Sequence, residues 1–210
     1  MANLYLNKII DLLRLKIKGH IVIDDFFPDE ICTQLRERIH NTKYYNFKYW
    51  DYNALEFDNN SGDYSLEYIS DKYIVPKIPL AEKYIRSWSF VYDNVARGVR
   101  PHIDQSFLNV NIWITPDECV EDHNKNGLRL YNKKAHVGKW KDGEDTSSWQ
   151  LYRRDDTFIT NYLKDSKYDI IPYKYNRAVV FEGKTFHSTD DVHMKPGNEN
   201  KRINYTFLYS

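Results

Sequence analysis

Two stretches of this sequence decide the fold: the C-terminal third and one short segment far upstream of it. The C-terminal third contains Arg177-Ala178-Val179-Val180-Phe181-Glu182-Gly183 and then Lys184-Thr185-Phe186-His187-Ser188-Thr189, and it closes with Lys201-Arg202-Ile203-Asn204-Tyr205-Thr206-Phe207-Leu208-Tyr209. The upstream segment is Pro101-His102-Ile103-Asp104. The apolar runs are typical of strands, so these stretches place two imidazoles, one carboxylate and one arginine on or beside predicted strands.

Over the rest of the sequence, most predicted helices come first and most predicted strands come later. Leu6, Ile9, Ile10 and Leu13 recur at helical spacing, which predicts an amphipathic helix over 3–14 that packs on the domain. The other expected elements are a strand over 20–23, a helix from Pro28 to Asn41, short strands within 43–75 around a turn at 59–62, a short helix over 81–86, strands over 88–92, 107–115, 128–131, 177–182, 185–189 and 201–209, and a weak helix over 157–163. This order predicts one α+β domain over residues 1–210 with a β core.

The strand over 107–115 has two different faces. Leu108, Val110 and Ile112 alternate with Asn109 and Asn111, and Trp113 continues the second face. Successive side chains of a strand point to opposite sides of the sheet. One face of this strand is therefore predicted to lie in the core, and the other is more polar.

Composition restricts the partners and the compartment. Lys plus Arg and Asp plus Glu both number 30, so no overall basic field favours nucleic acid or an acidic membrane. Cys32 and Cys119 form no disulfide framework, which suits a reducing compartment. Residues 1–16 lack the features of a signal peptide, and no apolar run reaches the roughly 20 residues of a membrane span. The sequence predicts a soluble, cytoplasmic protein without a membrane or nucleic-acid partner.

The histidines and the aspartate suggest a metal site. A pair of residues two apart on a strand shares one face, so His102 and Asp104 are expected to point the same way. The segment 187–202 reads as a hairpin that turns near 195–196, which would place Arg202 opposite His187. Two histidines and one carboxylate with open positions are the ligand set of many non-haem Fe(II) oxygenases. An arginine in the same cavity needs an anion, such as the far carboxylate of a dicarboxylic acid.

On these residues the chain resembles the Fe(II)- and 2-oxoglutarate-dependent oxygenases, which share a double-stranded β-helix (jelly-roll) core. His102, Asp104 and His187 match the metal triad of that family, and Arg202 matches the residue that binds the distal carboxylate of 2-oxoglutarate. The opening Val22-Ile23-Asp24-Asp25-Phe26-Phe27 also looks like the start of prolyl-hydroxylase-like members. Many relatives carry serine two residues after the arginine, where this chain has Asn204.

The resemblance extends to further residues around the cosubstrate. Tyr92 stands where some relatives have a tyrosine that contacts 2-oxoglutarate, although a core tyrosine is an alternative. Asn109 and Asn111 are expected to bond either to the cosubstrate or to the mouth of the barrel. The remaining histidines are interpreted as solvated or structural: His193 near the tip of the hairpin, His123, His136, His20 and His40.

The resemblance implies a dioxygenase that hydroxylates a small molecule or a peptide or protein side chain, with Fe(II), O2 and 2-oxoglutarate, and that releases succinate and CO2. The carboxylate ligand Asp104 favours hydroxylation over halogenation, because halogenating relatives lack it. Two alternatives remain: a cupin-like metalloprotein that does not use 2-oxoglutarate, and a non-catalytic binding module on a jelly-roll scaffold. The long charged segment 132–170, with Trp140, Trp149 and Tyr152, predicts either a flap over the site or a surface loop.

Overall fold

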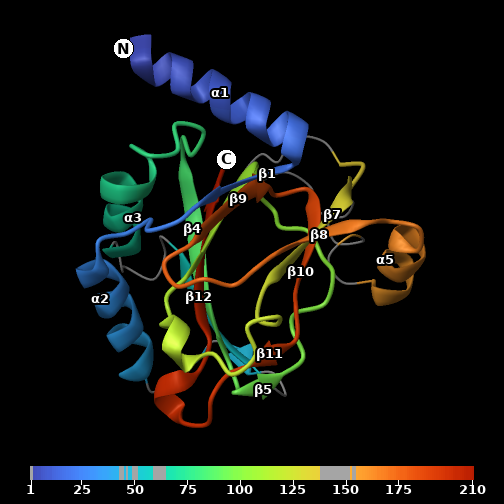
Figure 1. Cartoon of the computed structure of the whole chain (residues 1–210). Coiled ribbons are helices and arrows are strands. Elements are labelled where there is room, and N and C mark those ends of the chain that lie inside the picture. The colour runs from blue at the N-terminus through green and yellow to red at the C-terminus, as the bar shows by residue number, and fades with distance from the viewer. Residues whose placement is uncertain are drawn as a thin grey trace.

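The computed structural model describes residues 2–42, 45, 47–48, 52–58, 65–137, 152 and 155–210. Within these residues the strands form a seven-stranded, a three-stranded and a two-stranded sheet, all antiparallel (Figure 1). The large sheet has the order β1 (His20–Ile23), β9 (Ala178–Glu182), β6 (Leu108–Trp113), β12 (Ile203–Tyr209), β4 (Tyr84–Tyr92), β3 (Tyr52–Asp58), β2 (Phe47–Lys48). The three-stranded sheet has the order β10 (Thr185–Thr189), β7 (Leu128–Lys134), β8 (Tyr168–Ile171), and the small sheet pairs β11 (Val192–His193) with β5 (Val95–Ala96).

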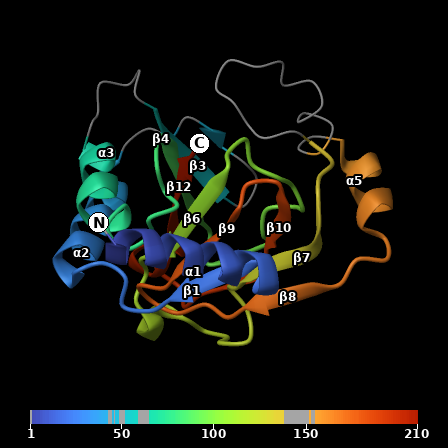
Figure 2. The same cartoon turned by 90° about the horizontal axis from the view of Figure 1, so that it is seen from above.

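The helices lie outside the sheets. They are α1 (Ala2–Lys18), α2 (Asp29–His40), α3 (Ser65–Ile69) and α5 (Asp156–Leu163), with a π-helix over Ser70–Ile74 and 3-10 turns over Asp117–Cys119 and Asn198–Asn200. Figure 2 shows α2 and α3 on one side of the large sheet, and the three-stranded sheet and α5 on the other side of the molecule. None of the described helices is long and apolar enough to cross a membrane.

Each face of the large sheet buries a different set of side chains. Leu108, Val110 and Ile112 of β6 belong to a core cluster that includes Ile31 and Leu35 of α2. The opposite face contributes Trp113, Val179 and Phe181 to a second cluster, together with Leu128 and Leu130 of β7. Because this second cluster draws on both sheets, the sheets pack face to face. The α+β fold with a jelly-roll core is confirmed, and so is the alternation predicted for 107–115.

Two expectations for the middle of the chain are wrong. The helix expected over 81–86 is absent, because Tyr84–Tyr92 forms one strand that pairs with both β3 and β12. Pairing on both edges overrides the weak helical preference of a six-residue segment. Conversely, 65–74 is helical where only strands were expected, since Leu66, Ile69 and Ile74 pack into the core. The turn expected at 59–62 lies outside the described residues.

The N-terminal helix is longer than expected and is oriented differently. It begins at Ala2 and ends at Lys18, and Gly19 follows with a φ of 77°, so the break predicted at that glycine is confirmed. The amide of Gly19 donates to the carbonyl of Leu15 (3.0 Å). However, Leu15 and Asp11 are the side chains that the domain buries, whereas Leu6 and Leu13 are exposed. The expectation that the apolar stripe packs on the domain is therefore wrong.

Asn176 fixes the turn that leads into β9 and ties it to the segment before α2. Its backbone has a φ of 56°, and its amide group is buried. The side chain accepts from the Phe27 amide (2.8 Å) and donates to the Phe27 carbonyl (2.7 Å). Asparagine tolerates the left-handed conformation, and its short amide satisfies two backbone groups that have no water nearby.

Replacing Asn176 with alanine should therefore destabilise the protein by about 2–6 kcal/mol, because two buried backbone groups each lose a partner at about 1–3 kcal/mol. Urea unfolding followed by circular dichroism measures this change. Asn176→Gly is the matched variant, because it keeps the positive φ at little cost and still removes both hydrogen bonds. An unchanged unfolding midpoint for both variants would contradict this role.

Candidate metal and cosubstrate site

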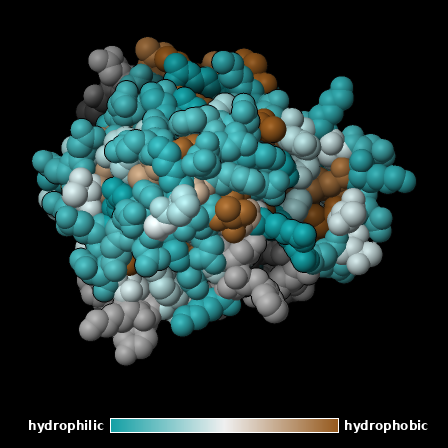
Figure 3. Space-filling view, turned by 60° about the horizontal axis from the view of Figure 1, so that its bottom comes forward, coloured by the Kyte–Doolittle hydropathy of each residue, from teal (hydrophilic) through white to brown (hydrophobic). Residues whose placement is uncertain are grey.

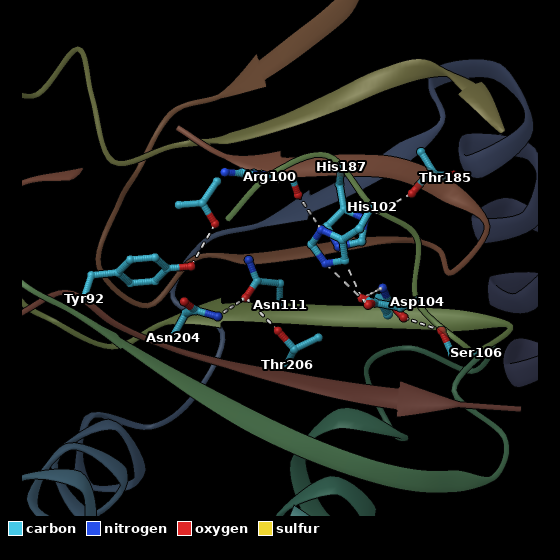
Figure 4. Close-up of polar contacts among 12 residues, drawn as sticks. Tyr92, Arg100, His102, Asp104, Ser106, Asn111, Thr185, His187, Asn204 and Thr206 are labelled. Atoms are coloured by element: carbon cyan, nitrogen blue, oxygen red, sulfur yellow. Dashed lines mark hydrogen bonds and ion pairs between the residues drawn. The ribbon is translucent and has the colours of Figure 1, made fainter. Parts of the chain in front are cut away.

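His102, Asp104 and His187 come together between the two sheets. One ligand atom from each lies within 4.8 Å of the others, and within the described residues this is the cluster of His, Cys, Asp or Glu side chains able to hold a metal ion. The Oδ2 atom of Asp104 is 3.2 Å from Nε2 of His187, and Oδ1 is 3.6 Å from Nε2 of His102. Figure 4 shows both imidazoles directed at the carboxylate of Asp104. Asp104 and His187 are buried, and His102 is half-buried.

The elements that hold these residues differ in part from the expectation. His187 lies on strand β10, as predicted. His102 and Asp104 lie in the loop that follows β5, not on a strand, so the same-face argument from a strand was wrong. Two backbone hydrogen bonds of 3.0 Å instead join His102 and His187 as an isolated bridge. The amide of Asp104 donates to the carbonyl of Gly183 (2.9 Å), which fixes the loop to the turn between β9 and β10.

Gly183 is required at this turn because of a close approach. A Cβ atom at this position would collide with the backbone of Ser106. The Glu-Gly turn seen in the sequence therefore has a structural purpose: it lets the loop carrying Asp104 lie directly against the strand end that leads to His187.

Backbone carbonyls fix the orientation of both imidazole rings. Nδ1 of His102 is 2.7 Å from the carbonyl of Arg100, and Nδ1 of His187 is 3.0 Å from the carbonyl of Thr185. A carbonyl only accepts, so each Nδ1 carries a proton, and each Nε2 faces Asp104. Such outer hydrogen bonds orient histidines that bind metals. The arrangement thus directs two imidazole nitrogens and one carboxylate to a common point.

Asn109 supports the carboxylate of the cluster. Its side-chain amide donates to Oδ2 of Asp104 (2.7 Å), and the hydroxyl of Ser106 donates to the amide oxygen of Asn109. The sequence predicted Asn109 on the polar face of its strand, and the structure has it there. Its amide lies beside Asp104. The amide of Asn109 thus orients the carboxylate of Asp104 towards the imidazoles.

Arg202 is not paired with His187 in a hairpin. Strand β10 belongs to the three-stranded sheet and β12 to the seven-stranded sheet, and His187 pairs with Leu130 of β7. The carbonyl of Arg202 accepts from the amide of Tyr92 (3.0 Å). The predicted hairpin was wrong because the chain crosses from one sheet to the other between 189 and 203. His193 is likewise not at a hairpin tip: it is half-buried on β11 and pairs with Val95.

Arg202 nevertheless reaches the space between the sheets. Arg202 is 1% exposed, and its guanidinium lies over the rings of Tyr92 (4.8 Å), Trp113 (5.7 Å) and Tyr173 (5.8 Å). It donates to the carbonyl of Asn126 and to Oδ1 of Asn204, both at 3.0 Å. Within the described residues it forms no ion pair. Burial lowers the pKa of Arg202, yet a guanidinium remains charged in proteins.

Asn204, which accepts from Arg202, belongs to a polar network across the sheet that Figure 4 shows with Asn111 and Thr206. The amide of Asn204 donates to Oδ1 of Asn111 (2.9 Å), and the hydroxyl of Thr206 donates to the same oxygen (3.2 Å). The hydroxyl of Tyr92 lies 2.9 Å from that of Thr189, two residues beyond His187. The structure therefore brings Tyr92 and Asn111 to the same space as Arg202, and it gives Asn204 a direct bond to the guanidinium.

Sequence reasoning missed several partners of Arg202. Tyr173 lies in a segment with no motif. Asn126 belongs to the turn dipeptide Asn126-Gly127, but that signal predicts a turn and not a contact with Arg202. Thr189 shares a strand face with His187 two residues earlier, which was a usable signal. Trp113 was read as packing, but its ring also lies against Arg202, and its buried indole N–H has no acceptor among the described residues.

No protein-family model and no curated protein matches this sequence. Solved structures do match its fold. The α-ketoglutarate-dependent epimerase SnoN from nogalamycin biosynthesis is 12% identical, with a TM-score of 0.63 over 99% of this chain and 83% of SnoN. HygX from Streptomyces hygroscopicus, solved with nickel and 2-oxoglutarate, is 7% identical, with a TM-score of 0.62 over 96% and 86%. A Pseudomonas putida prolyl-4-hydroxylase is 12% identical, with a TM-score of 0.56 over 95% and 96%.

A further match, from Burkholderia pseudomallei, is described as an oxidoreductase of the 2OG-Fe(II) oxygenase family, with a TM-score of 0.60 at 10% identity. The chain covers most of the length of each of these neighbours. The fold expected from the resemblance is therefore the fold observed. At such low identity the likeness establishes the fold alone. Chemistry has to be argued from the residues between the sheets.

Proposed function

We propose that this chain is an Fe(II)- and 2-oxoglutarate-dependent dioxygenase that hydroxylates a small molecule or a peptide or protein side chain. The observation that carries the proposal is a pairing of two features in one inter-sheet space. One is the cluster of His102, Asp104 and His187, and the other is the buried guanidinium of Arg202, which forms no ion pair with any residue that the structure describes. A cupin-like metal site or an inert jelly roll gives no reason for the second feature.

The three ligands fit Fe(II). Two imidazoles that direct Nε2 at Asp104 and one carboxylate would hold Fe(II) and leave coordination positions open, as non-haem Fe(II) oxygenases require. Asp104 is buried beside two imidazoles, so its negative charge needs a cation or a proton nearby. The carbonyls that hold both Nδ1 protons and the amide of Asn109 complete the support for this set.

The surroundings of Arg202 fit the distal carboxylate of 2-oxoglutarate. A fully buried cation is costly without a counter-anion, and a carboxylate supplies one through charge-assisted hydrogen bonds. The indole N–H of Trp113 and the hydroxyl of Tyr92 add donors on the same side. The rings around Arg202 exclude water, which strengthens the attraction between the guanidinium and an anion.

Contacts connect the two features. The ring of Phe181 lies 4.8 Å from that of His187, and Phe181 packs in the same cluster as Trp113 and Tyr92. Thr189 joins Tyr92 to the strand that carries His187. A five-carbon dicarboxylate held by Arg202 at one end is thereby directed towards the three ligands at its other end.

When bound, Fe(II) with 2-oxoglutarate and O2 supplies oxidative decarboxylation to succinate and CO2, coupled to oxidation of a substrate C–H bond. The chain positions the reactants: Arg202 fixes the cosubstrate, the triad holds the metal and the aromatic rings keep water out. Asp104 supports hydroxylation, because a carboxylate in this position leaves no room for halide. Neighbours of this fold include an epimerase and a carbocyclase, so the substrate decides the final product.

The purified protein should convert 2-oxoglutarate to succinate only when Fe(II) and O2 are both present. Succinate formed across pooled amino acids, proline-containing peptides and small metabolites measures the activity, and an anaerobic Fe(II) titration measures the metal site separately. Stoichiometric Fe(II) binding without any succinate in any pool would favour a metalloprotein that does not use 2-oxoglutarate. Failure to bind Fe(II) would contradict the proposal as a whole.

A further inference from the structure

Helix α1 turns its most apolar face away from the rest of the protein. At 100° per residue, positions 6, 9, 10, 13 and 17 form one continuous stripe. Leu6, Leu13 and Ile17 are 55%, 51% and 78% exposed, and Ile9 and Ile10 are exposed as well. The domain instead holds the opposite side of the helix, through Asp11 and Leu15. Exposed large apolar side chains that share one stripe indicate an interaction surface.

The helix also carries a local excess of positive charge. It contains Lys8, Arg14, Lys16 and Lys18 against the single acid Asp11, an excess of four minus one, or three. Asp11 lies on the buried side, where desolvation raises its pKa. On the helical projection Lys16 is next to Ile9 and Arg14 is next to Ile10, so cations border the apolar stripe on both sides. The zero net charge of the whole chain conceals this local excess.

Figure 3 shows the contrast with the rest of the surface. Most of that face is hydrophilic, and hydrophobic side chains show at its upper edge and in smaller groups at the centre and on the right. In Figure 1, α1 projects above the sheets and touches the domain mainly near its C-terminal end. Its described apolar stripe is therefore accessible to a large, flat partner.

We propose that α1 binds the surface of a membrane that contains anionic lipids. The stripe would enter the boundary between headgroups and acyl chains, and Arg14 and Lys16 would lie at the level of the lipid phosphates. The helix would lie along the surface and not cross the membrane, since it is neither long nor apolar enough to span it. Membrane binding would hold the oxygenase fold at the lipid surface. This proposal does not depend on the function proposed above.

Charge and length favour a membrane over a second copy of the chain. In a pair of α1 helices, the cations that border each stripe would face cations of the other helix, and like charges at such positions repel. The stripe from Leu6 to Ile17 also covers fewer than the three or four heptads that a helix pair normally needs. An anionic lipid surface, in contrast, complements both the stripe and its borders.

The test is co-sedimentation of the full-length protein with vesicles of phosphatidylcholine that contain about one third phosphatidylglycerol. We expect binding to these vesicles, much weaker binding to pure phosphatidylcholine, and loss of binding in high salt. Leu13→Gln, on the stripe, should weaken binding at least tenfold. Its matched control is Leu12→Gln, which changes a neighbouring exposed leucine off the stripe and should alter binding about twofold at most.

A second variant tests the charges. Arg14→Gln with Lys16→Gln should weaken binding about 25-fold, since each basic residue near an anionic surface contributes about fivefold. Unchanged circular dichroism shows that each variant is folded. The proposal is overturned if the wild-type protein ignores anionic vesicles or if Leu12→Gln and Leu13→Gln weaken binding equally. It is also overturned if the protein is a dimer that Leu13→Gln dissociates.

Discussion

Replacing Asp104 with alanine should abolish Fe(II)-dependent formation of succinate and weaken Fe(II) binding by at least about 100-fold. Asp104 provides the only negative charge among the three ligands, and removal of a group that merely orients a ligand already costs 10–100-fold. The protein should remain folded, because the change removes a buried carboxylate and little core volume. Anaerobic Fe(II) titration, succinate assay and thermal unfolding measure the three outcomes.

Two histidine variants provide the matched comparison. His187→Ala should lose iron in the same way, because Nε2 of His187 lies 3.2 Å from Asp104. His193→Ala should bind iron normally, because His193 pairs with Val95 in the small sheet and is not part of the cluster. If Asp104→Ala kept full turnover, or if His193→Ala lost iron while His187→Ala did not, the assignment of the metal site would be wrong.

The parts of the fold that follow from local pattern were predictable from the sequence. Alternation along 107–115 correctly separated Leu108, Val110 and Ile112, which face α2, from Asn109 and Asn111, which face the site. This works because a strand has a period of two whatever its neighbours are. The break at Gly19 followed in the same way from a conformation that glycine adopts readily.

The pairing of distant segments was not predictable in this way. A polar loop between two strand-like segments favours a hairpin, so His187 was expected opposite Arg202. In the jelly roll these two segments belong to different sheets, and each pairs with strands far away in the sequence, such as β7 and β6. The site was still assembled from the right residues, because both segments direct side chains into the space between the sheets.

Tertiary packing also decided which face of α1 is buried. Periodicity shows that a helix has an apolar stripe, but it does not show which side meets the domain. Here Leu15 and Asp11 meet the domain, and the ion pair between Lys8 and Glu82 lies beside them. A helix whose best apolar stripe is exposed is at odds with simple patterning, and such conflicts tend to mark functional surfaces.

Arg202→Met should leave Fe(II) affinity nearly unchanged and weaken 2-oxoglutarate binding about 30-fold to several-thousand-fold. Loss of one partner of a buried charge pair commonly costs about 2–5 kcal/mol, which corresponds to that range. Methionine keeps an apolar stem among the rings of Tyr92, Trp113 and Tyr173 and removes only the charge and its hydrogen bonds. Titration of 2-oxoglutarate into the metal-loaded protein measures the change in affinity.

The same variant separates a ligand-binding arginine from a structural one. Without 2-oxoglutarate, Arg202 is a buried cation with no ion pair among the described residues, and its removal relieves the cost of burying that charge. The lost hydrogen bonds to Asn126 and Asn204 oppose this gain, so Arg202→Met should unfold at about the same temperature as the wild type. With 2-oxoglutarate, only the wild type should gain stability, because a ligand stabilises the folded state that binds it. Arg177→Met is the control: Arg177 bonds to Asp24 outside the site (2.6 Å), so this variant should lose some stability and keep its affinity for 2-oxoglutarate. If Arg202→Met were strongly destabilised without ligand and still bound 2-oxoglutarate normally, Arg202 would serve the fold and not the cosubstrate.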